Sequence, residues 1–439
     1  MSRMMVVGYE LPDLAEGAIE ARSYRTWQFV EPLLDDGHEV CLIVSHEIDA
    51  AAVSHALSPC LTYHRLDMRR LGWPKRLRQL HNRFDPDGLL AVMFNNCLRV
   101  TRLSTDRPIW MDVYGDRLAE AQVAEYTQGS SRGRRNTFRY LRMILSQGDV
   151  YSTCGTPQKH ALVGQLAMAA RLNRHTLGYE FVHPILPGAP RRLAAEGEGL
   201  SLRDDLVRAD GFVVLWCGGY NVWTDVDVLF QALDAAMSAE PRVEFVSVGG
   251  KSGHAENDAY DRLLGMIDGS AHRQRYHMLG WRPVSEVPIY YRGADVGISL
   301  DAFHYETLLG TRTRLVEMMG YGLPVITTLG CELSDIIRDQ ELGLTFSIGD
   351  ADGLCEQILR LAGSPARTQA LAERAQRYAA EELSFAETTR QFREWAVQPY
   401  HAPDLDPNRR RWDPREVEYY LRSVIRGWLW HFGALERGE

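Results

Sequence analysis

Short apolar runs alternate along the chain with longer stretches in which apolar residues recur at helical spacing. Three runs in the first half are "MMVVGYE" (4–10), "HEVCLIVS" (38–45) and "PIWMDVYGD" (108–116), and the spacing between the first two predicts a helix over about 20–36. From Gly211 the alternation restarts with "GFVVLWCGG" and continues through "RVEFVSVGG", "DVGISLD" and "LPVITT". Strands that alternate with helices predict parallel sheets covered by helices on both faces.

The pattern divides the chain into two units joined by a linker. We expect a first Rossmann-like domain over 1–186, a linker over 187–210 where proline, glycine and charged residues gather, and a second Rossmann-like domain over 211–396. The last segment, 397–439, is expected to hold an aromatic-rich helix over 413–433. Its aromatic and basic residues suit a membrane surface, but the interpretation we favour is that it crosses back to the first domain.

Composition narrows the choice of function. Of the 439 residues, 45% are hydrophobic and 24% are charged, as in ordinary globular domains. The formal net charge of -9 argues against a broad surface for nucleic acid. The cysteines form no CxxC pair or zinc spacing, so neither a metal site nor a structural disulfide is expected. Without a signal-peptide pattern or a long apolar run, we expect a cytoplasmic protein whose contact with membranes is at most peripheral.

The stretch "GTRTRLVEMMGYGLPVITT" (310–328) predicts a site for a small anion. Its apolar spacing indicates a helix that begins near Gly310 and precedes a strand. Ligands bind beyond the carboxyl ends of parallel strands, where Gly218 and Gly219 also lie. The unpaired N–H groups of a helix start cradle phosphate. Arg312 and Arg314 can add charge-assisted hydrogen bonds there, and Thr311 and Thr313 are further candidates for binding the donor. The alternative is an exposed helix with an Arg314–Glu317 ion pair.

The order of these parts resembles the carboxyl-terminal domain of GT-B glycosyltransferases, specifically the large retaining family numbered four. The resemblance covers about residues 211–365 and rests on the strand ending in Gly-Gly, "DVLFQAL", "LGW", "VSEVPIYYRGADVGISL", the helix just described and "GLPVIT". It implies an α/β fold of two Rossmann-like, doubly wound parallel-sheet domains that face each other across a cleft. It also implies a nucleoside-diphosphate sugar as donor, no metal and no other cofactor.

The resemblance assigns roles to individual positions. Glu317 matches a glutamate that holds the ribose of the donor, and Trp281 and Arg282 match positions whose backbone reads the base. Gly17 matches a glycine of the first domain that approaches the donor phosphates. The backbone at Thr311 and Arg312 matches the part that faces the diphosphate or the sugar.

The sequence also departs from the family at charged positions. Leu309 stands where the family has its first glutamate, and the nearest acid is Glu306. Gly219 and Thr224 stand where the family has an arginine and a lysine against the diphosphate. We therefore expect Arg312 and Arg314 to replace them, as in a divergent branch that has "ET" and "RTR" in this place. The turn "GGYNVW" adds Tyr220, Asn221 and Trp223 as donor-site candidates, with a buried aromatic turn as the alternative.

The first domain gives weaker signals. Tyr114 lies where the family has a histidine, and Asp112 and Asp116 beside it are candidates for binding the sugar or the acceptor; a polar strand end and a helix cap are the alternatives. A dedicated base is not required, because retaining enzymes of this type use the leaving phosphate as the base. The basic segment "GSSRGRRN" (129–136) is expected to be a loop that either meets an anionic acceptor or is simply solvated.

The function predicted from these signals is that of a hexosyltransferase. It would move a sugar from a nucleoside diphosphate to a hydroxyl of a glycan, a lipid-linked acceptor or a small molecule, with retention implied by the resemblance only. The alternative is a GT-B protein that binds a nucleotide or glycan without transfer, since Leu309, Gly219 and Thr224 replace charged groups. A dinucleotide-dependent oxidoreductase is disfavoured, because neither domain's first strand is followed by G-x-G-x-x-G.

Overall fold

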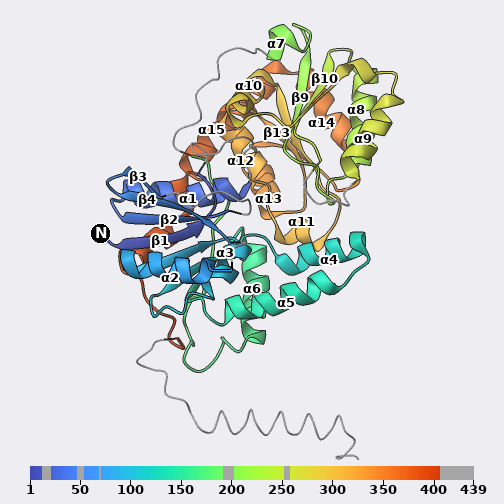
Figure 1. Ribbon diagram of the computed structural model, residues 1–439. Helices are drawn as coiled ribbons and strands as arrows, with labels where there is room; N and C mark the ends of the chain where they lie inside the picture. The colour runs from blue at the N-terminus through green and yellow to red at the C-terminus, as the bar shows by residue number, and fades with distance from the viewer. Residues whose placement is uncertain (12–20, 47–53, 69–70, 191–201, 252–257, 406–439) are drawn as a thin grey trace, which may run out of the picture.

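A computed structural model describes residues 1–11, 21–46, 54–68, 71–190, 202–251 and 258–405 of the chain. It consists of two α/β units stacked one above the other, each with a central sheet covered by helices (Figure 1). The predicted fold class is therefore confirmed. Within the described residues, none of the helices combines the length and the apolar character that a membrane span requires.

The first sheet has eight strands in the order β3-β4-β2-β1-β5-β6-β7-β8, parallel except for the β3–β4 pair. Its strands are β1 (Arg3–Gly8), β2 (Glu39–His46), β3 (Ser54–Ser58), β4 (Leu61–Asp67), β5 (Gly88–Val92), β6 (Ile109–Asp112), β7 (Val150–Thr153) and β8 (Val182–Pro184). The first unit's helices are α1 (Ala21–Asp35), α2 (Trp73–Phe84), α3 (Phe94–Val100), α4 (Arg117–Gln128), α5 (Arg132–Leu145) and α6 (Thr156–Met168).

The second sheet has six parallel strands in the order β11-β10-β9-β12-β13-β14. Its strands are β9 (Phe212–Cys217), β10 (Val243–Val248), β11 (Tyr276–Gly280), β12 (Val296–Ser299), β13 (Val325–Thr328) and β14 (Gly343–Phe346). The helices described from residue 202 on are α7 (Leu202–Asp205), α8 (Val226–Ala239), α9 (Ala259–Asp268), α10 (Val287–Gly293), α11 (Tyr305–Leu309), α12 (Thr313–Gly320), α13 (Glu332–Asp339), α14 (Ala351–Ala362), α15 (Pro365–Glu381), α16 (Phe385–Thr388) and α17 (Arg390–Val397), with 3-10 turns η2 (Arg273–Arg275) and η3 (Val284–Glu286).

Local sequence explains where these elements begin. The central strands are buried along their whole length, because helices cover both faces of each sheet; β9 and β10 are buried at every position. Side chains of Asp116, Asp225 and Asp350 accept backbone N–H groups at the starts of α4, α8 and α14. The helix α15 starts with Pro365, whose missing N–H costs nothing at that position.

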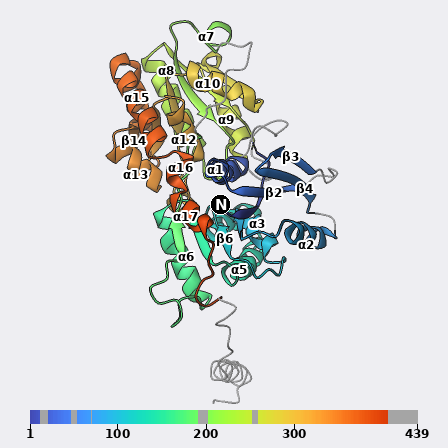
Figure 2. The same cartoon turned by 90° about the vertical axis from the view of Figure 1, so that its left-hand side faces the viewer.

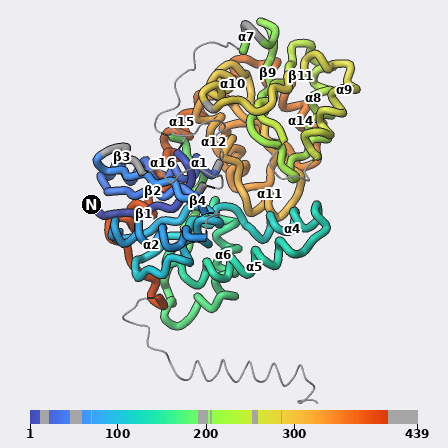
Figure 3. The backbone as a smooth tube through the Cα atoms, in the orientation of Figure 1, coloured from blue at the N-terminus to red at the C-terminus, as the bar shows by residue number. Residues whose placement is uncertain are grey.

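The chain returns to the first domain after α15. In Figure 2, α16 and α17 lie beside the first unit, and Figure 3 traces this red segment back to the blue strands. Phe392 and Trp395 of α17 join the core formed by Met4 and Trp110 on one face of the first sheet. The helix predicted over 413–433 lies outside the described residues.

Candidate functional site

The second sheet offers a crevice where its strand order reverses. β9 lies between β10 and β12, so the connections after β9 and β12 leave on opposite sides. The turn after β9 contains Gly218 and Gly219, and the segment after β12 contains Asp301. Such a switch point is where α/β sheets bind ligands.

Glycine is required where two strand ends meet at this crevice. Gly249 follows β10 with φ +128°, and an added Cβ would lie 2.0 Å from the carbonyl oxygen of Gly218. Gly218 itself has φ +118°, a conformation that side chains disfavour. The double glycines predicted to mark these strand ends thus allow a close approach of backbone, and a Cβ on Gly218 would lie 3.5 Å from the guanidinium of Arg314 on α12.

The amino terminus of α12 faces this turn. Arg314 donates from Nη2 to the carbonyl of Gly219 at 3.2 Å, and its guanidinium lies 4.2 Å from the ring centroid of Trp216. Its Nη1 and the Oγ1 of Thr311 are buried and have no hydrogen-bond partner in the part of the chain that the structure describes. Burial lowers the pKa of Arg314. Two buried donors therefore remain unused at the start of a helix, an arrangement suited to an anion.

Arg312 has a different environment, and the prediction that it contacts the diphosphate needs correction. Nε donates to Asp301 at 2.7 Å, and Nη1 and Nη2 donate to the two carboxylate oxygens of Glu306 at 3.1 and 2.8 Å. All three side chains are buried. Burial opposes the charge of Arg312, but Asp301 and Glu306 overcome it and raise its pKa. Every guanidinium nitrogen of Arg312 is thus committed inside the protein, and so is Glu306, a predicted donor ligand.

The aromatic turn after β9 is mainly structural. Tyr220 is fully buried, stacks on Trp216 with ring centroids 4.8 Å apart, and shares a 2.8 Å hydrogen bond with Ser247. This is the alternative that the sequence left open. Trp223 lies under the guanidinium of Arg312, and its carbonyl accepts the N–H of Ala302. Asn221 is partly buried, and its backbone N–H is bound by Thr224.

Three further predicted donor residues, Glu317, Trp281 and Arg282, lie around the same edge. Glu317 accepts the hydroxyl of Tyr291 at 2.8 Å, and burial raises its pKa while Tyr291 and Arg314 oppose the rise. Trp281 follows β11 and is 53% exposed, and Arg282 beside it has a buried Nε without a partner among the described residues. Gly17 lies outside the described residues.

Across the crevice, the first domain presents a buried charge pair. Asp112 at the end of β6 accepts two hydrogen bonds from Arg25, at 2.7 and 3.1 Å, and one from Ser152. Asp112 is fully buried, so it holds Arg25 and is not open to an acceptor as predicted. The guanidinium of Arg25 lies 4.6 Å from the ring of Tyr114, whose hydroxyl shares a 2.9 Å hydrogen bond with Thr313. Sequence reasoning missed Arg25, because nothing local links it to residue 112.

Two further contacts join the domains beside this hydrogen bond. The Sγ of Cys154, after β7, lies 3.3 Å from the carbonyl of Leu309. The hydroxyl of Thr156 donates to Glu332 at 2.7 Å. The starts of α6, α12 and α13 are therefore held close together, which fixes the width of the crevice in this structure.

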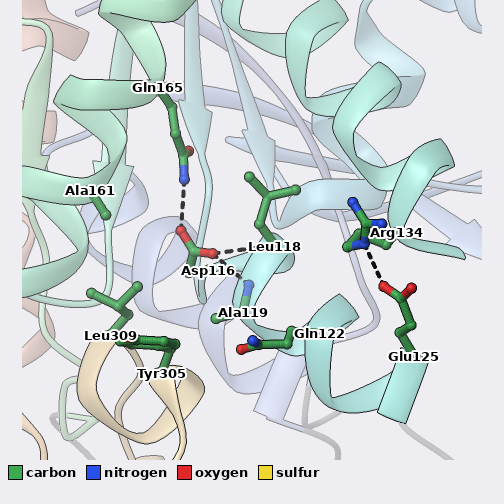
Figure 4. A pocket seen from close by; sticks show the side chains of 10 residues that line it. All are labelled: Asp116, Leu118, Ala119, Gln122, Glu125, Arg134, Ala161, Gln165, Tyr305 and Leu309. Carbon is green, nitrogen blue, oxygen red and sulfur yellow. Dashed lines mark hydrogen bonds and ion pairs between the residues drawn. The ribbon is translucent and has the colours of Figure 1, made fainter. Parts of the chain in front are cut away.

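A cavity of about 450 Å³ lies between the domains, and Figure 4 shows its lining. Asp116 caps α4 with one oxygen and accepts Gln165 of α6 with the other, which is the capping role the sequence offered as an alternative. Tyr305 and Leu309 close the cavity from α11 of the second domain. It is lined by Asp116, Leu118, Ala119, Gln122, Glu125, Arg134, Ala161, Gln165, Tyr305 and Leu309. This volume suits a small ligand or one end of a larger one.

Most of the basic segment 129–136 is helical, because α5 takes in residues 132–136. Gly129 ends α4 with φ +64°, and α5 begins at Arg132. Leu141, Ile144 and Leu145 bury the inner side of α5, so the helix is set by apolar residues beyond the segment. The expectation of a flexible basic loop was wrong for residues 132–136.

Comparisons with known proteins support the same architecture. Residues 211–364 match a family model described as "Glycosyl transferases group 1". No curated protein matches the sequence. Sucrose-phosphate synthase from Thermosynechococcus elongatus is 17% identical, covers 91% of this chain and 99% of its own, and superposes with a TM-score of 0.70. Anabaena HepE in complex with UDP-glucose is 16% identical over 90% and 100% of the two chains, with a TM-score of 0.66.

A trehalose-phosphate synthase described as UDP-forming, from Burkholderia vietnamiensis, is 13% identical with a TM-score of 0.64, over 90% of this chain and 100% of its own. At these identities the structural likeness establishes the fold alone, and it spans both domains. Together with the two sheets described above, it shows that the chain has the GT-B fold, and residues 211–364 of its second domain are similar to the group 1 glycosyltransferase model.

Proposed function

We propose that the protein is a hexosyltransferase that moves a sugar from a nucleoside-diphosphate sugar to a hydroxyl acceptor, with retention of configuration. One observation carries the proposal: buried donors of Arg314 and Thr311 at the start of α12 have no partner among the described residues, and they lie beside the turn at Gly218 and Gly219. A buried donor without a partner is costly, so its persistence argues for a ligand that satisfies it. The match of this domain to glycosyltransferases makes a diphosphate the natural candidate.

In the proposed mechanism, Arg314 and the N–H groups of α12 stabilise the negative charge that develops on the leaving diphosphate. Glu317, one turn deeper in the helix, accepts hydroxyl protons of the ribose. The backbone at Trp281 and Arg282 contacts the base. Arg312 acts indirectly, because its pairing with Asp301 and Glu306 ties the loop after β12 to the start of α12.

The acceptor is proposed to enter the cavity between α4, α6 and α11. The cavity combines the exposed ring of Tyr305 with polar groups of Gln122 and Gln165, and an aromatic face beside amide groups suits a carbohydrate hydroxyl acceptor. Its walls come from both domains, so a bound acceptor would contact the domain that carries the donor site.

The test is a thermal-stabilisation assay with UDP, GDP, ADP and their glucose conjugates, followed by an assay for diphosphate release. We expect one nucleotide class to stabilise the protein, and Arg314→Gln to lower its affinity at least tenfold. Arg262→Gln is the matched control, because Arg262 is an exposed arginine on α9 that pairs with Asp227. Saturable binding without release, with or without a panel of sugar acceptors, would instead favour the non-catalytic alternative. Equal affinity of the Arg314 variant would refute the assignment of the site.

A further inference from the structure

Charge is distributed unevenly over the first domain. The helices α2, α3, α5 and α6 contain no aspartate or glutamate, although the chain as a whole has a net charge of -9. Leu77, Cys97, Ile144 and Leu162 from these helices share one apolar core, so the four helices cover the same face of the first sheet. We call their outer side the basic face. It lies on the opposite side of the sheet from α1 and α17 (Figure 2).

The outer side of α5 is the most strongly charged part of this face. Four arginines recur at i, i+3, i+7 and i+10 and form one exposed stripe, namely Arg132, Arg135, Arg139 and Arg142. Because an α-helix rises about 1.5 Å per residue, the ten residue steps from the first arginine to the last extend the stripe over roughly 15 Å. None of the four pairs with a carboxylate of the described residues, whereas Arg134 on the flank pairs with Glu125. An uncompensated stripe of this kind attracts an anionic partner.

Apolar side chains accompany the charge. Phe138 on α5 is 54% exposed, Met168 at the end of α6 is 81% exposed, and Leu71 just before α2 is fully exposed. A soluble polyanion would be held by charge alone and would leave these side chains in water. The interfacial zone of a bilayer accepts both, since arginine binds lipid phosphates while apolar tips enter between headgroups.

We propose that the basic face docks the protein on a bilayer that contains anionic lipids. Because the inner side of α5 is buried in the core, the helix stays folded in the domain and contacts the surface without inserting. Arg134 lines the cavity between the domains, so docking through α5 places the mouth of that cavity beside the headgroups. The proposal itself stands whether or not the protein transfers a sugar.

The experiment is co-sedimentation of the full chain with vesicles of phosphatidylcholine, with and without phosphatidylglycerol. We expect binding only to the anionic vesicles, and binding that weakens as salt is added. Each arginine near an anionic surface contributes about fivefold to the partition coefficient, so replacing all four stripe arginines by glutamine should lower it roughly 600-fold. Glutamine is a good helix former, which keeps α5 intact.

The matched control is the quadruple glutamine variant of Arg360, Arg367, Arg374 and Arg377, which are exposed on α14 and α15 of the second domain. It changes the net charge equally and should bind as the wild type does. Phe138→Ser should weaken binding to anionic vesicles several-fold without changing its salt dependence. The proposal is overturned if the wild-type protein does not bind anionic vesicles, or if the quadruple glutamine variant of α5 binds them equally well. It is also overturned if the wild-type protein binds heparin through the stripe but binds no vesicle.

Discussion

Replacing Arg312 should lower the free energy of unfolding, because it leaves two buried carboxylates without their cationic partner. Its guanidinium bridges Asp301 and Glu306 through contacts of 2.7 to 3.1 Å, and the three side chains are at most 8% exposed. Removing one member of a buried ion pair costs about 3–5 kcal/mol, since the remaining charge has neither water nor a partner. Arg312→Met strands two carboxylates, so the upper part of this range is expected.

The loss is measurable as a change in the midpoint of unfolding. In a domain of this size, 1 kcal/mol shifts the melting temperature by about 2–4 °C, so Arg312→Met should lower it by roughly 10 °C. Arg314→Met is the control, because within the described ranges Arg314 makes a single hydrogen bond, to the carbonyl of Gly219. Its cost should stay near 1 kcal/mol, while nucleotide binding is lost.

A double-mutant cycle separates the ion pair from simple packing. Arg312→Met combined with Glu306→Gln should cost less than the two single changes together, by about 1–3 kcal/mol, because the double variant no longer buries an unpaired glutamate. The cycle is read from urea unfolding of the four proteins. If Arg312→Met unfolds within about 0.5 kcal/mol of the wild type, a value typical of surface changes, the reasoning about this triad is refuted.

Three further predictions concern the crevice. Burial raises the pKa of Glu317 above 4.5, so this carboxyl stays protonated to higher pH in the folded state than in the unfolded state. The free energy of unfolding should therefore fall as the pH rises from 4.5 through the raised pKa. In urea midpoints measured against pH, Glu317→Gln should remove this part of the slope. Arg25→Met should cost about 3–5 kcal/mol, because it strands the buried Asp112, and Asp112→Asn should cost less; equal costs in urea unfolding would contradict this. Glu332→Gln should loosen the contact with Thr156 and increase the radius of gyration in X-ray scattering, and an unchanged radius would argue against a role in closure.

The sequence predicts the fold well, because the fold depends on the periodicity of apolar residues and on the glycines that mark the ends of strands. Fully buried strands such as 212–217 and 243–248 read as continuous apolar runs, and a glycine such as Gly218 marks where each strand must turn sharply. These signals are local. They place the crevice correctly, since the topology of alternating strands and helices brings the carboxyl ends of parallel strands to one edge.

The roles of the charged residues depend on contacts that the sequence does not show. Arg312 and Arg314 are two positions apart and look equivalent, yet the loop after β12 folds back and delivers Asp301 and Glu306 to only one of them. Asp112 likewise meets Arg25 from a distant helix. Such pairs form because desolvating a charge is too costly without a partner. Arg314, whose buried Nη1 has no partner among the described residues, is therefore a better candidate than Arg312 for binding a substrate, and the structure is needed to tell the two apart.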